Sequence, residues 1–226
     1  MRSVQARVCR SRASPSRPGG WWRTQSVCSG TGARTRQCGA DSLVLNPHKW
    51  LGVAFDCSLY YVRDPQHLVR VMSTNPSYLR SGVDEKVKNL RDWGIPLGRR
   101  FRALKLWCLI REQGVSGLQA RLRRDIENAR WLAAGVEKTP HWRVLAPVPL
   151  QTVCVRHGPP GLEGDALDRH TLAWADRINR SGAAYLTPAT LDGRWMVRVS
   201  IGALPTQRRD VEALWGVMRR EAEAAG

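Results

Sequence analysis

The chain of 226 residues contains no apolar run long enough for a membrane-spanning helix, and no apolar segment of the kind that directs secretion. Its six cysteines form no Cys-x-x-Cys pair, so the sequence implies no disulfide framework and no zinc or other metal site. Acidic residues are scarce, at 19 against 36 lysines and arginines. These absences argue against a membrane protein or a disulfide-rich secreted protein and favour a reducing, cytoplasmic compartment.

The formal net charge of +17 is unevenly distributed along the chain. Residues 1–40 contain eight arginines and no acidic residue, so much of the excess lies in this segment. A nucleic-acid-binding protein would show a basic stripe with interleaved aromatic residues, or a known binding module. The sequence shows neither, and we therefore predict no nucleic-acid partner.

Residues 1–38 differ in composition from the rest of the chain. They are rich in Arg, Ser, Gly, Thr and Pro and follow neither helical nor strand periodicity. A transit peptide would be rich in Arg and Ser too, but it would form an amphipathic helix, which the prolines and glycines at 15–20 interrupt. We predict a disordered or non-homologous lead-in.

A lysine in an unusual setting follows this lead-in. Leu43–Leu45 reads as a short buried strand, and Asn46-Pro47 favours a turn directly after it. Lys49 comes next, between a histidine and a tryptophan, and the alternating residues 53–62 predict a second strand that pairs with the first as a hairpin. A lysine held in this way either forms a Schiff base with a carbonyl cofactor or lies in a turn on the surface.

Three segments in order carry a resemblance to a known family. Asn-Pro-His-Lys-Trp at 46–50, followed by Phe-Asp-Cys-Ser at 55–58, resembles the cofactor-lysine segment of the pyridoxal-phosphate-dependent (group II) aromatic-L-amino-acid decarboxylases. Residues 91–107 resemble the family segment W-x-I-P-L-[GS]-R-R-F-R-x-[LVM]-K-x-W. Asn-Pro-Ser-Tyr-Leu at 75–79 resembles the tyrosine segment of the catalytic loop. The resemblance covers about residues 40–226.

The resemblance implies the α/β fold of a fold-type I pyridoxal enzyme, also called PLP-dependent transferase-like. Residues 39–139 would be the C-terminal portion of the large cofactor-binding domain with the catalytic loop, and residues 140–226 the small C-terminal α+β domain. Residues 1–38 stay unassigned. Short strands and amphipathic helices after Thr139-Pro140 agree with a small α+β domain.

The implied activity is decarboxylation of aromatic L-amino acids to amines, with release of carbon dioxide. Pyridoxal 5′-phosphate is the implied cofactor, and the family works as a homodimer. Carried over by position, the implied catalytic residues are Lys49 and Tyr78, the cofactor-binding residues are Lys49, His48 and Asn46, and the candidate substrate-binding residues are Trp50 and Phe55. For either aromatic residue, a plain core role is the more common alternative.

Two alternatives remain beside this activity. The family segments that stack on the cofactor ring, pair with its nitrogen and bind its phosphate precede the lysine, and residues 1–48 do not resemble them, so the chain is alternatively an inactive truncated fragment. Relatives with phenylalanine at the tyrosine position make aldehydes, so an aromatic aldehyde synthase is the other alternative. Trp50 and Gly98 resemble the aromatic enzymes, but the sequence leaves open which aromatic amino acid is used.

Periodicity further predicts helices, strands and their caps. A helix from Leu97 would bury a stripe made of Phe101, Leu104, Trp107 and Cys108 and stop at Gly114. Four later strands are predicted, at 142–145, 150–155, 184–186 and 196–201. One later helix would bury the stripe 167, 171, 174 and 178. A last helix, capped by Thr206, would bury the stripe 211, 214, 215 and 218. Cys57, Cys108 and Cys154 read as buried thiols. For Arg198, in the last predicted strand, a surface salt bridge is a more common role than a contact with a substrate carboxylate.

Overall fold

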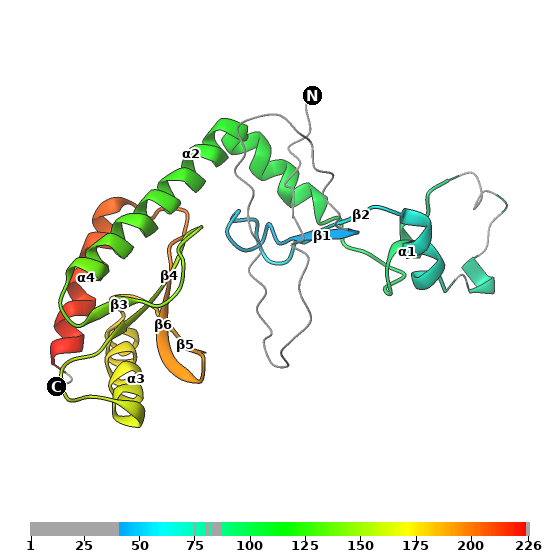
Figure 1. Cartoon of the computed structure of the whole chain (residues 1–226). Helices are drawn as coiled ribbons and strands as arrows, with labels where there is room; N and C mark the ends of the chain where they lie inside the picture. The colour runs from blue at the N-terminus through cyan, green and yellow to red at the C-terminus, as the bar shows by residue number, and fades with distance from the viewer. Residues whose placement is uncertain (1–40, 75, 80–81, 83–86, 225–226) are drawn as a thin grey trace, which may run out of the picture. The chain divides into compact units, whose positions relative to one another are not determined.

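The computed structural model describes residues 41–74, 76–79, 82 and 87–224 (Figure 1). The lead-in predicted at 1–38 and Asn75 of the tyrosine segment lie outside these residues. The described residues divide into two compact units. We call residues 41–48 and 55–104 the hairpin unit, and residues 49–54 and 105–224 the sheet unit. Within the described ranges, no helix combines the length and apolar character that crossing a membrane requires.

The hairpin unit contains the strand pair predicted around the lysine. β1 (Ser42–Leu45) and β2 (Leu59–Val62) pair antiparallel, with Leu45 opposite Leu59. The second strand was predicted to begin at residue 53, which is wrong: residues 53–58 are irregular. The reason is local, because the backbone N–H of Cys57 donates to Nδ1 of His48 at 3.1 Å and its carbonyl accepts from the His48 backbone N–H at 3.2 Å. These groups are therefore not available to a longer ladder.

Short helices follow in the same unit. α1 (Pro65–Met72) begins at a proline, and the carboxylate of Asp64 caps it by accepting from the N–H groups of Gln66 and His67. Two 3₁₀ turns, η1 (Ser77–Leu79) and η2 (Leu90–Trp93), lie further along this unit.

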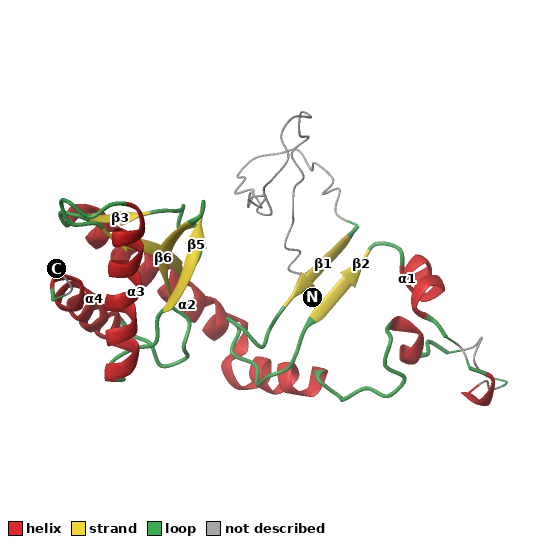
Figure 2. Cartoon of the chain, turned by 90° about the horizontal axis from the view of Figure 1, so that it is seen from below, coloured by secondary structure: helices red, strands yellow, loops and turns green. Residues whose placement is uncertain are grey.

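The sheet unit is built on four antiparallel strands in the order β3-β4-β6-β5. Figure 2 shows β3, β5 and β6 beside the helices of the unit. The strands are β3 (Trp142–Val144), β4 (Thr152–His157), β5 (Thr187–Leu191) and β6 (Arg194–Ser200). The strand predicted at 184–186 is wrong, because the side chain of Asn179 holds the backbone of Leu186 through two hydrogen bonds, of 2.7 and 2.9 Å. Asp192 and Gly193 have φ of 51° and 76° and form the tight turn between β5 and β6.

Three helices complete the unit: α2 (Ala103–Lys138), which lies in it from Lys105 onward, α3 (Gly164–Ser181) and α4 (Arg208–Glu223). Alternate residues of the central strands, such as Val155 and Val197, point into a core that they share with these helices. The predicted stripes of α3 and α4 are confirmed at Trp174 and Met218, both fully buried. The predicted cap is wrong: α4 is capped by Gln207, whose backbone N–H donates to the Asp210 carboxylate.

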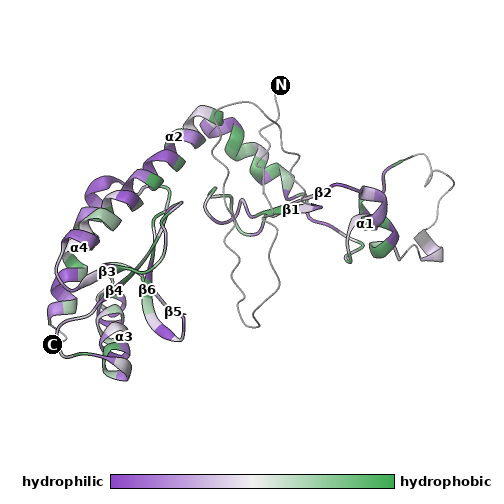
Figure 3. Ribbon diagram, in the orientation of Figure 1, coloured by the Kyte–Doolittle hydropathy of each residue, from purple (hydrophilic) through white to green (hydrophobic). Residues whose placement is uncertain are grey.

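The long helix α2 confirms in part the helix that was predicted to run from Leu97 to Gly114. Gly114 has non-helical angles, φ 66° and ψ 169°, so helical geometry breaks where the sequence predicted a stop. The helix begins at Ala103 and not at Leu97, after a segment in which Asp56 holds Arg102 at 2.9 Å. The stripe predicted as buried is exposed, with Phe101 75% and Trp107 57% accessible. Figure 3 shows hydrophobic residues along the first part of α2.

Two further predictions concern the burial of the cysteines and the position of the domain boundary. Of the three cysteines predicted to be buried, Cys57 is buried, Cys154 is half-buried and Cys108 is exposed. The domain limits near Thr139-Pro140 stay a prediction, although the compact units are divided elsewhere. The second half of α2 contributes Leu132 and Val136 to the same core as the residues after the predicted boundary.

Candidate active site

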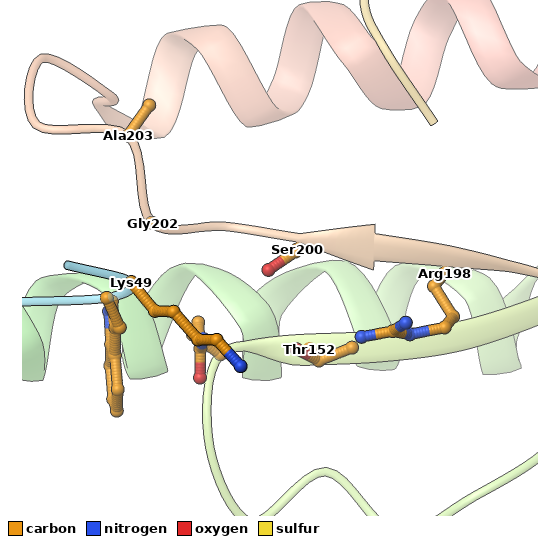
Figure 4. A pocket seen from close by; sticks show the side chains of 8 residues that line it. Lys49, Thr152, Arg198, Ser200, Gly202 and Ala203 are labelled. Carbon is orange, nitrogen blue, oxygen red and sulfur yellow. The ribbon is translucent and has the colours of Figure 1, made fainter. Parts of the chain in front are cut away.

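Lys49 lines an open cleft of about 430 Å³ in the sheet unit. The walls of the cleft are formed by the start of the lysine loop, which we define as residues 49–54, and by the ends of β4 and β6. Its lining consists of Lys49, Trp50, Gln151, Thr152, Arg198, Ser200, Gly202 and Ala203. In Figure 4 the amine of Lys49 and the guanidinium of Arg198 reach into the same space from opposite sides. The amine has no hydrogen-bond or ion-pair partner in the described part of the chain.

A buried pair of charged residues on α2 holds the lysine loop in place. Arg121 donates from both terminal nitrogens, to the carbonyl of Trp50 at 3.0 Å and to that of Leu51 at 2.8 Å. The indole N–H of Trp50 donates to the carboxylate of Asp125 at 2.9 Å. Asp125 is fully buried and Arg121 is 8% exposed. We call Arg121 and Asp125 the loop clamp, because together they fix both backbone and side chain of the residue next to Lys49.

The far side of the loop is held by close packing against the segment after β6. A methyl group built on Gly202 would lie 3.0 Å from Cδ1 of Trp50, and one built on Gly52 would lie 2.8 Å from Cδ2 of Leu204. Gly52 also has φ of 80°, which side-chain-bearing residues rarely adopt. The lysine loop therefore lies between α2 and the chain at 202–204, with almost no free space at either glycine.

The close approach at Gly202 leads to a prediction. Gly202→Ala is expected to lower the free energy of unfolding by about 1–2 kcal/mol, because the new methyl group must displace the Trp50 ring by a few tenths of an ångström. Urea denaturation followed by far-UV circular dichroism measures the change. Gly117→Ala is the control, since its methyl group would meet only ordinary contact at 3.7 Å inside a helix. Equal stability of wild type and Gly202→Ala would contradict the packing described here.

Asn46 and His48 both fix the turn before the lysine. The hydroxyl of Ser58 donates to Oδ1 of Asn46 at 2.7 Å, and Nδ1 of His48 accepts from the backbone of Cys57. These contacts lie in the hairpin unit and tie the two ends of the β1–β2 connection together. The role at a cofactor phosphate that the resemblance implies for both residues stays a prediction.

The structure distributes the remaining predicted site residues between the two units. Trp50 lines the cleft beside Lys49. Phe55 lies in the hairpin unit, is 84% exposed and packs edge-on against the ring of His48 at 5.0 Å between centroids. Tyr78 lies on η1, also in the hairpin unit, and is 75% exposed. The structure thus brings Lys49 and Trp50 together, while the roles of Phe55 and Tyr78 stay predictions.

Several residues of the site were missed by the sequence analysis. Arg121 and Asp125, four residues apart on a helix, have the pattern of an exposed ion pair, and nothing local reveals their burial. Thr152 and Ser200 are polar positions next to core-facing valines in their strands, and this alternation was the available signal. Arg198 was noticed but placed in a surface salt bridge, and in the described residues no such bridge forms.

The donor set fits a carbonyl cofactor. A free lysine amine can bond to a carbonyl carbon, and the adjoining wall offers the hydroxyl groups of Thr152 and Ser200 and the amide of Gln151. The fold and the cleft thus define a class of protein: an α/β protein in which a lysine on a tightly held loop faces a cleft open to small molecules.

Comparison with known proteins identifies the family. Residues 33–157, more than half of the chain, match the pyridoxal-dependent decarboxylase conserved domain. The chain belongs to this family of pyridoxal-dependent carboxy-lyases, as the motifs around Lys49 predicted. A tryptophan decarboxylase of Camptotheca acuminata is 36% identical over 81% of this chain, and a phenylacetaldehyde synthase of Arabidopsis thaliana is 35% identical over 81%. The chain spans little more than a third of these relatives, 37% and 38% of their lengths.

Solved structures agree with this assignment. The Oryza sativa enzyme TDC, solved with PLP and tryptamine, superposes with a TM-score of 0.76 at 30% identity, over 81% of this chain and 39% of that one. Tryptophan decarboxylase of Catharanthus roseus, solved with L-tryptophan, superposes with a TM-score of 0.72 at 32% identity, over 82% and 39%. The predicted fold class, that of the fold-type I pyridoxal enzymes, is confirmed.

Proposed function

We propose that the protein acts in the pyridoxal-phosphate-dependent decarboxylation of aromatic L-amino acids, which yields an amine and carbon dioxide. The observation that carries the proposal is the free amine of Lys49, which lies in an open cleft on a loop held by Arg121 and Asp125. Relatives named for tryptophan, tyrosine and aromatic-L-amino-acid decarboxylation support the substrate class.

In this proposal each residue of the chain has a defined task. Lys49 would hold the cofactor through its amine, and Trp50 beside it would offer an aromatic wall to the substrate. When bound, pyridoxal phosphate supplies the electron sink that allows the bond to the carboxylate to break. Tyr78, exposed on its short turn, supplies the proton that replaces the carboxylate, from its phenolic oxygen. His48 and Asn46 hold the turn before the lysine and would bind the cofactor phosphate.

Aldehyde synthesis is the second candidate. The observation that favours it is the similarity to phenylacetaldehyde synthases, one from Arabidopsis thaliana and one from a Rosa hybrid cultivar, at 35% and 34% identity. Tyr78 favours the decarboxylase, because the resemblance associates phenylalanine at that position with aldehyde formation. Homodimer assembly and a cytoplasmic location remain parts of the proposal that follow from the resemblance and the composition.

Covalent trapping tests the proposal directly. We expect that incubation of the full chain with pyridoxal phosphate and reduction with borohydride will give one stoichiometric adduct at Lys49, because its amine is free and faces the cleft. Peptide mass spectrometry locates the adduct. Lys49→Ala should lose it, whereas Lys138→Ala, at the end of α2, should keep it.

The trapping experiment is followed by product analysis. Aromatic L-amino acids supplied to the loaded protein should give amines, whereas aldehydes as the main product would favour the second candidate. An adduct at Lys49 without turnover would mean that the chain binds the cofactor but performs no chemistry. Weak labelling spread over many lysines, unchanged by Lys49→Ala, would contradict the proposed role of this lysine.

A further inference from the structure

The segment between β6 and α4, residues 201–207, forms one wall of the Lys49 cleft although it belongs to no helix or strand. Two of its residues, Gly202 and Ala203, line the cleft (Figure 4). The backbone N–H of Ile201 donates to the carbonyl of Gln151 at 3.0 Å, which fixes the start of the segment to the sheet. The position of the following residues depends on contacts with α2.

Arg124 of α2 holds this segment at Leu204. A terminal nitrogen of the Arg124 guanidinium donates to the carbonyl of Leu204 at 3.1 Å. The Nε of the same guanidinium lies 3.7 Å from Oδ1 of Asp125, which is fully buried. The cleft wall is therefore attached to the same turns of α2 that carry the loop clamp.

Leu204 in turn packs on the lysine loop. Its Cδ2 would lie 2.8 Å from a methyl group built on Gly52, so the leucine side chain rests directly on the glycine backbone. Gly52 closes the turn that begins at the lysine, because its backbone N–H donates to the carbonyl of Lys49 at 3.1 Å. Three successive contacts thus connect the guanidinium of Arg124 to the backbone of Lys49.

The loop clamp holds other parts of the same turn. Its hydrogen bonds go to the carbonyls of Trp50 and Leu51 and to the indole of Trp50. None of these bonds involves the backbone of Lys49 or Gly52. The turn is therefore held at its middle by the loop clamp and at its end by Leu204.

We propose that Arg124 is a positioning residue for the reaction: it holds Leu204 against Gly52 and thereby fixes the backbone from which the Lys49 amine extends. The inference rests on the proposed function, because it specifies what keeps that amine in place in the cleft. Loss of the guanidinium would leave the lining groups unchanged but let the turn open more often. The amine would then occupy its reactive position for a smaller fraction of the time.

Hydrogen–deuterium exchange of the full chain without cofactor tests the inference at the Gly52 amide, which the bond to Lys49 protects. Arg124→Met should accelerate exchange in a peptide that covers the lysine loop about fivefold, because a partly exposed, charged hydrogen bond is lost. Arg124→Lys should exchange more slowly than Arg124→Met, since an ammonium can also donate to the Leu204 carbonyl. Arg123→Met, at the exposed position before it on α2, is the matched control and should exchange as wild type does.

A second variant removes the next contact in the series. Leu204→Ala keeps the carbonyl that Arg124 holds but removes the side chain that packs on Gly52, so it should also accelerate exchange of the lysine loop. Leu204 is 43% exposed, so the truncated chain should stay folded. Unchanged exchange in Leu204→Ala would overturn the inference even if Arg124→Met failed to fold. Unchanged exchange in a folded Arg124→Met would overturn it too.

Arg208→Met distinguishes positioning from a general loss of stability. The Nε of Arg208 donates to Oδ1 of Asn128 at 2.9 Å, and its guanidinium lies over the ring of Trp131 at 5.0 Å, so it ties the start of α4 to α2. Arg208→Met should lower the melting temperature as Arg124→Met does but should leave exchange of the lysine loop unchanged. Equal acceleration in both variants would overturn the inference.

The borohydride adduct separates the inference from the proposed function. Arg124→Met should form the adduct at Lys49 more slowly than wild type, and Arg123→Met should form it at the wild-type rate. A wild-type rate in Arg124→Met would overturn the positioning role. Failure of the wild type itself to form the adduct would instead count against the proposed function, and the exchange measurements would still decide whether Arg124 holds the turn at Lys49.

Discussion

Lowering the pH from 6.5 to 4 is expected to reduce the free energy of unfolding of the sheet unit by about 3 kcal/mol through one residue, His157. His157 lies on β4 and is 6% exposed. Burial, together with the charges of His170 and His141, lowers the pKa of His157 from 6.5 to about 4. Its ring packs against Trp142 at 4.9 Å between centroids, and its Nδ1 lies 2.9 Å from Nε2 of His170.

The direction of the effect follows from proton binding. Between pH 6.5 and 4 the unfolded chain binds a proton at His157, while the folded protein keeps this imidazole neutral. Acid therefore favours the unfolded state throughout that window, and the contribution of His157 to stability is present above pH 6.5 and fully lost below pH 4. The cost arises because a charged ring cannot be accommodated between a second histidine and an aromatic wall.

Urea denaturation at several pH values measures this loss. His157→Gln is the suitable comparison, because a glutamine amide can keep a hydrogen bond to His170 but does not titrate in this range. The carboxylates of the protein titrate in both proteins, so the difference between the two curves isolates His157. We expect wild type to lose about 3 kcal/mol more than the variant between pH 6.5 and 4. Parallel curves would show that the imidazole is not held neutral.

Asp125→Ala is expected to lower the free energy of unfolding by about 2–3 kcal/mol and to loosen the loop that bears Lys49. The substitution leaves the indole N–H of Trp50 without its acceptor and removes the partner, at 3.7 Å, of Arg124. The lost carboxylate is fully buried, and the partly buried indole N–H that it leaves behind carries part of the desolvation penalty of an unpaired polar group. Because Trp50 is the residue next to Lys49, the loss of its hydrogen bond to Asp125 should also leave Lys49 less firmly positioned.

Two variants and two measurements separate the clamp from a general loss of stability. Asp125→Asn keeps an oxygen that can accept from Trp50, so it should cost about 1 kcal/mol and keep most of the cofactor adduct at Lys49. Asp125→Ala should reduce the adduct under conditions in which circular dichroism shows the chain still folded. Equal adduct yields in the two variants would mean that Asp125 stabilises α2 without positioning the lysine.

The sequence predicted those parts of the fold that depend on local patterns. The stripes of α3 and α4, the break at Gly114 and the hairpin around Lys49 all follow from periodicity or from glycine and proline positions. Periodicity shows which residues share a face, but it does not show whether another element covers that face. The stripe through Phe101 and Trp107 was therefore predicted to be buried and is exposed.

The candidate site was predicted only where motifs identify single residues. Lys49 and Trp50 were found because an unusual run of residue types surrounds them, and the structure places both at one cleft. The loop clamp was not found, since a buried aspartate and arginine on a helix have the same spacing as a solvated pair. Arg198 was predicted to form a surface salt bridge, but in the described residues it forms none, and the partners of a strand residue depend on which elements lie beside it.

The contact between Trp50 and the loop clamp also gives the protein an optical reporter. The indole of Trp50 is hydrogen-bonded to Asp125 and lines the cleft directly beside Lys49. A chromophore attached to Lys49 would lie next to this ring and quench its emission, in proportion to the fraction of chains that carry it. The difference in fluorescence between wild type and Trp50→Phe would therefore follow the loading of the cleft in real time, before any product is formed.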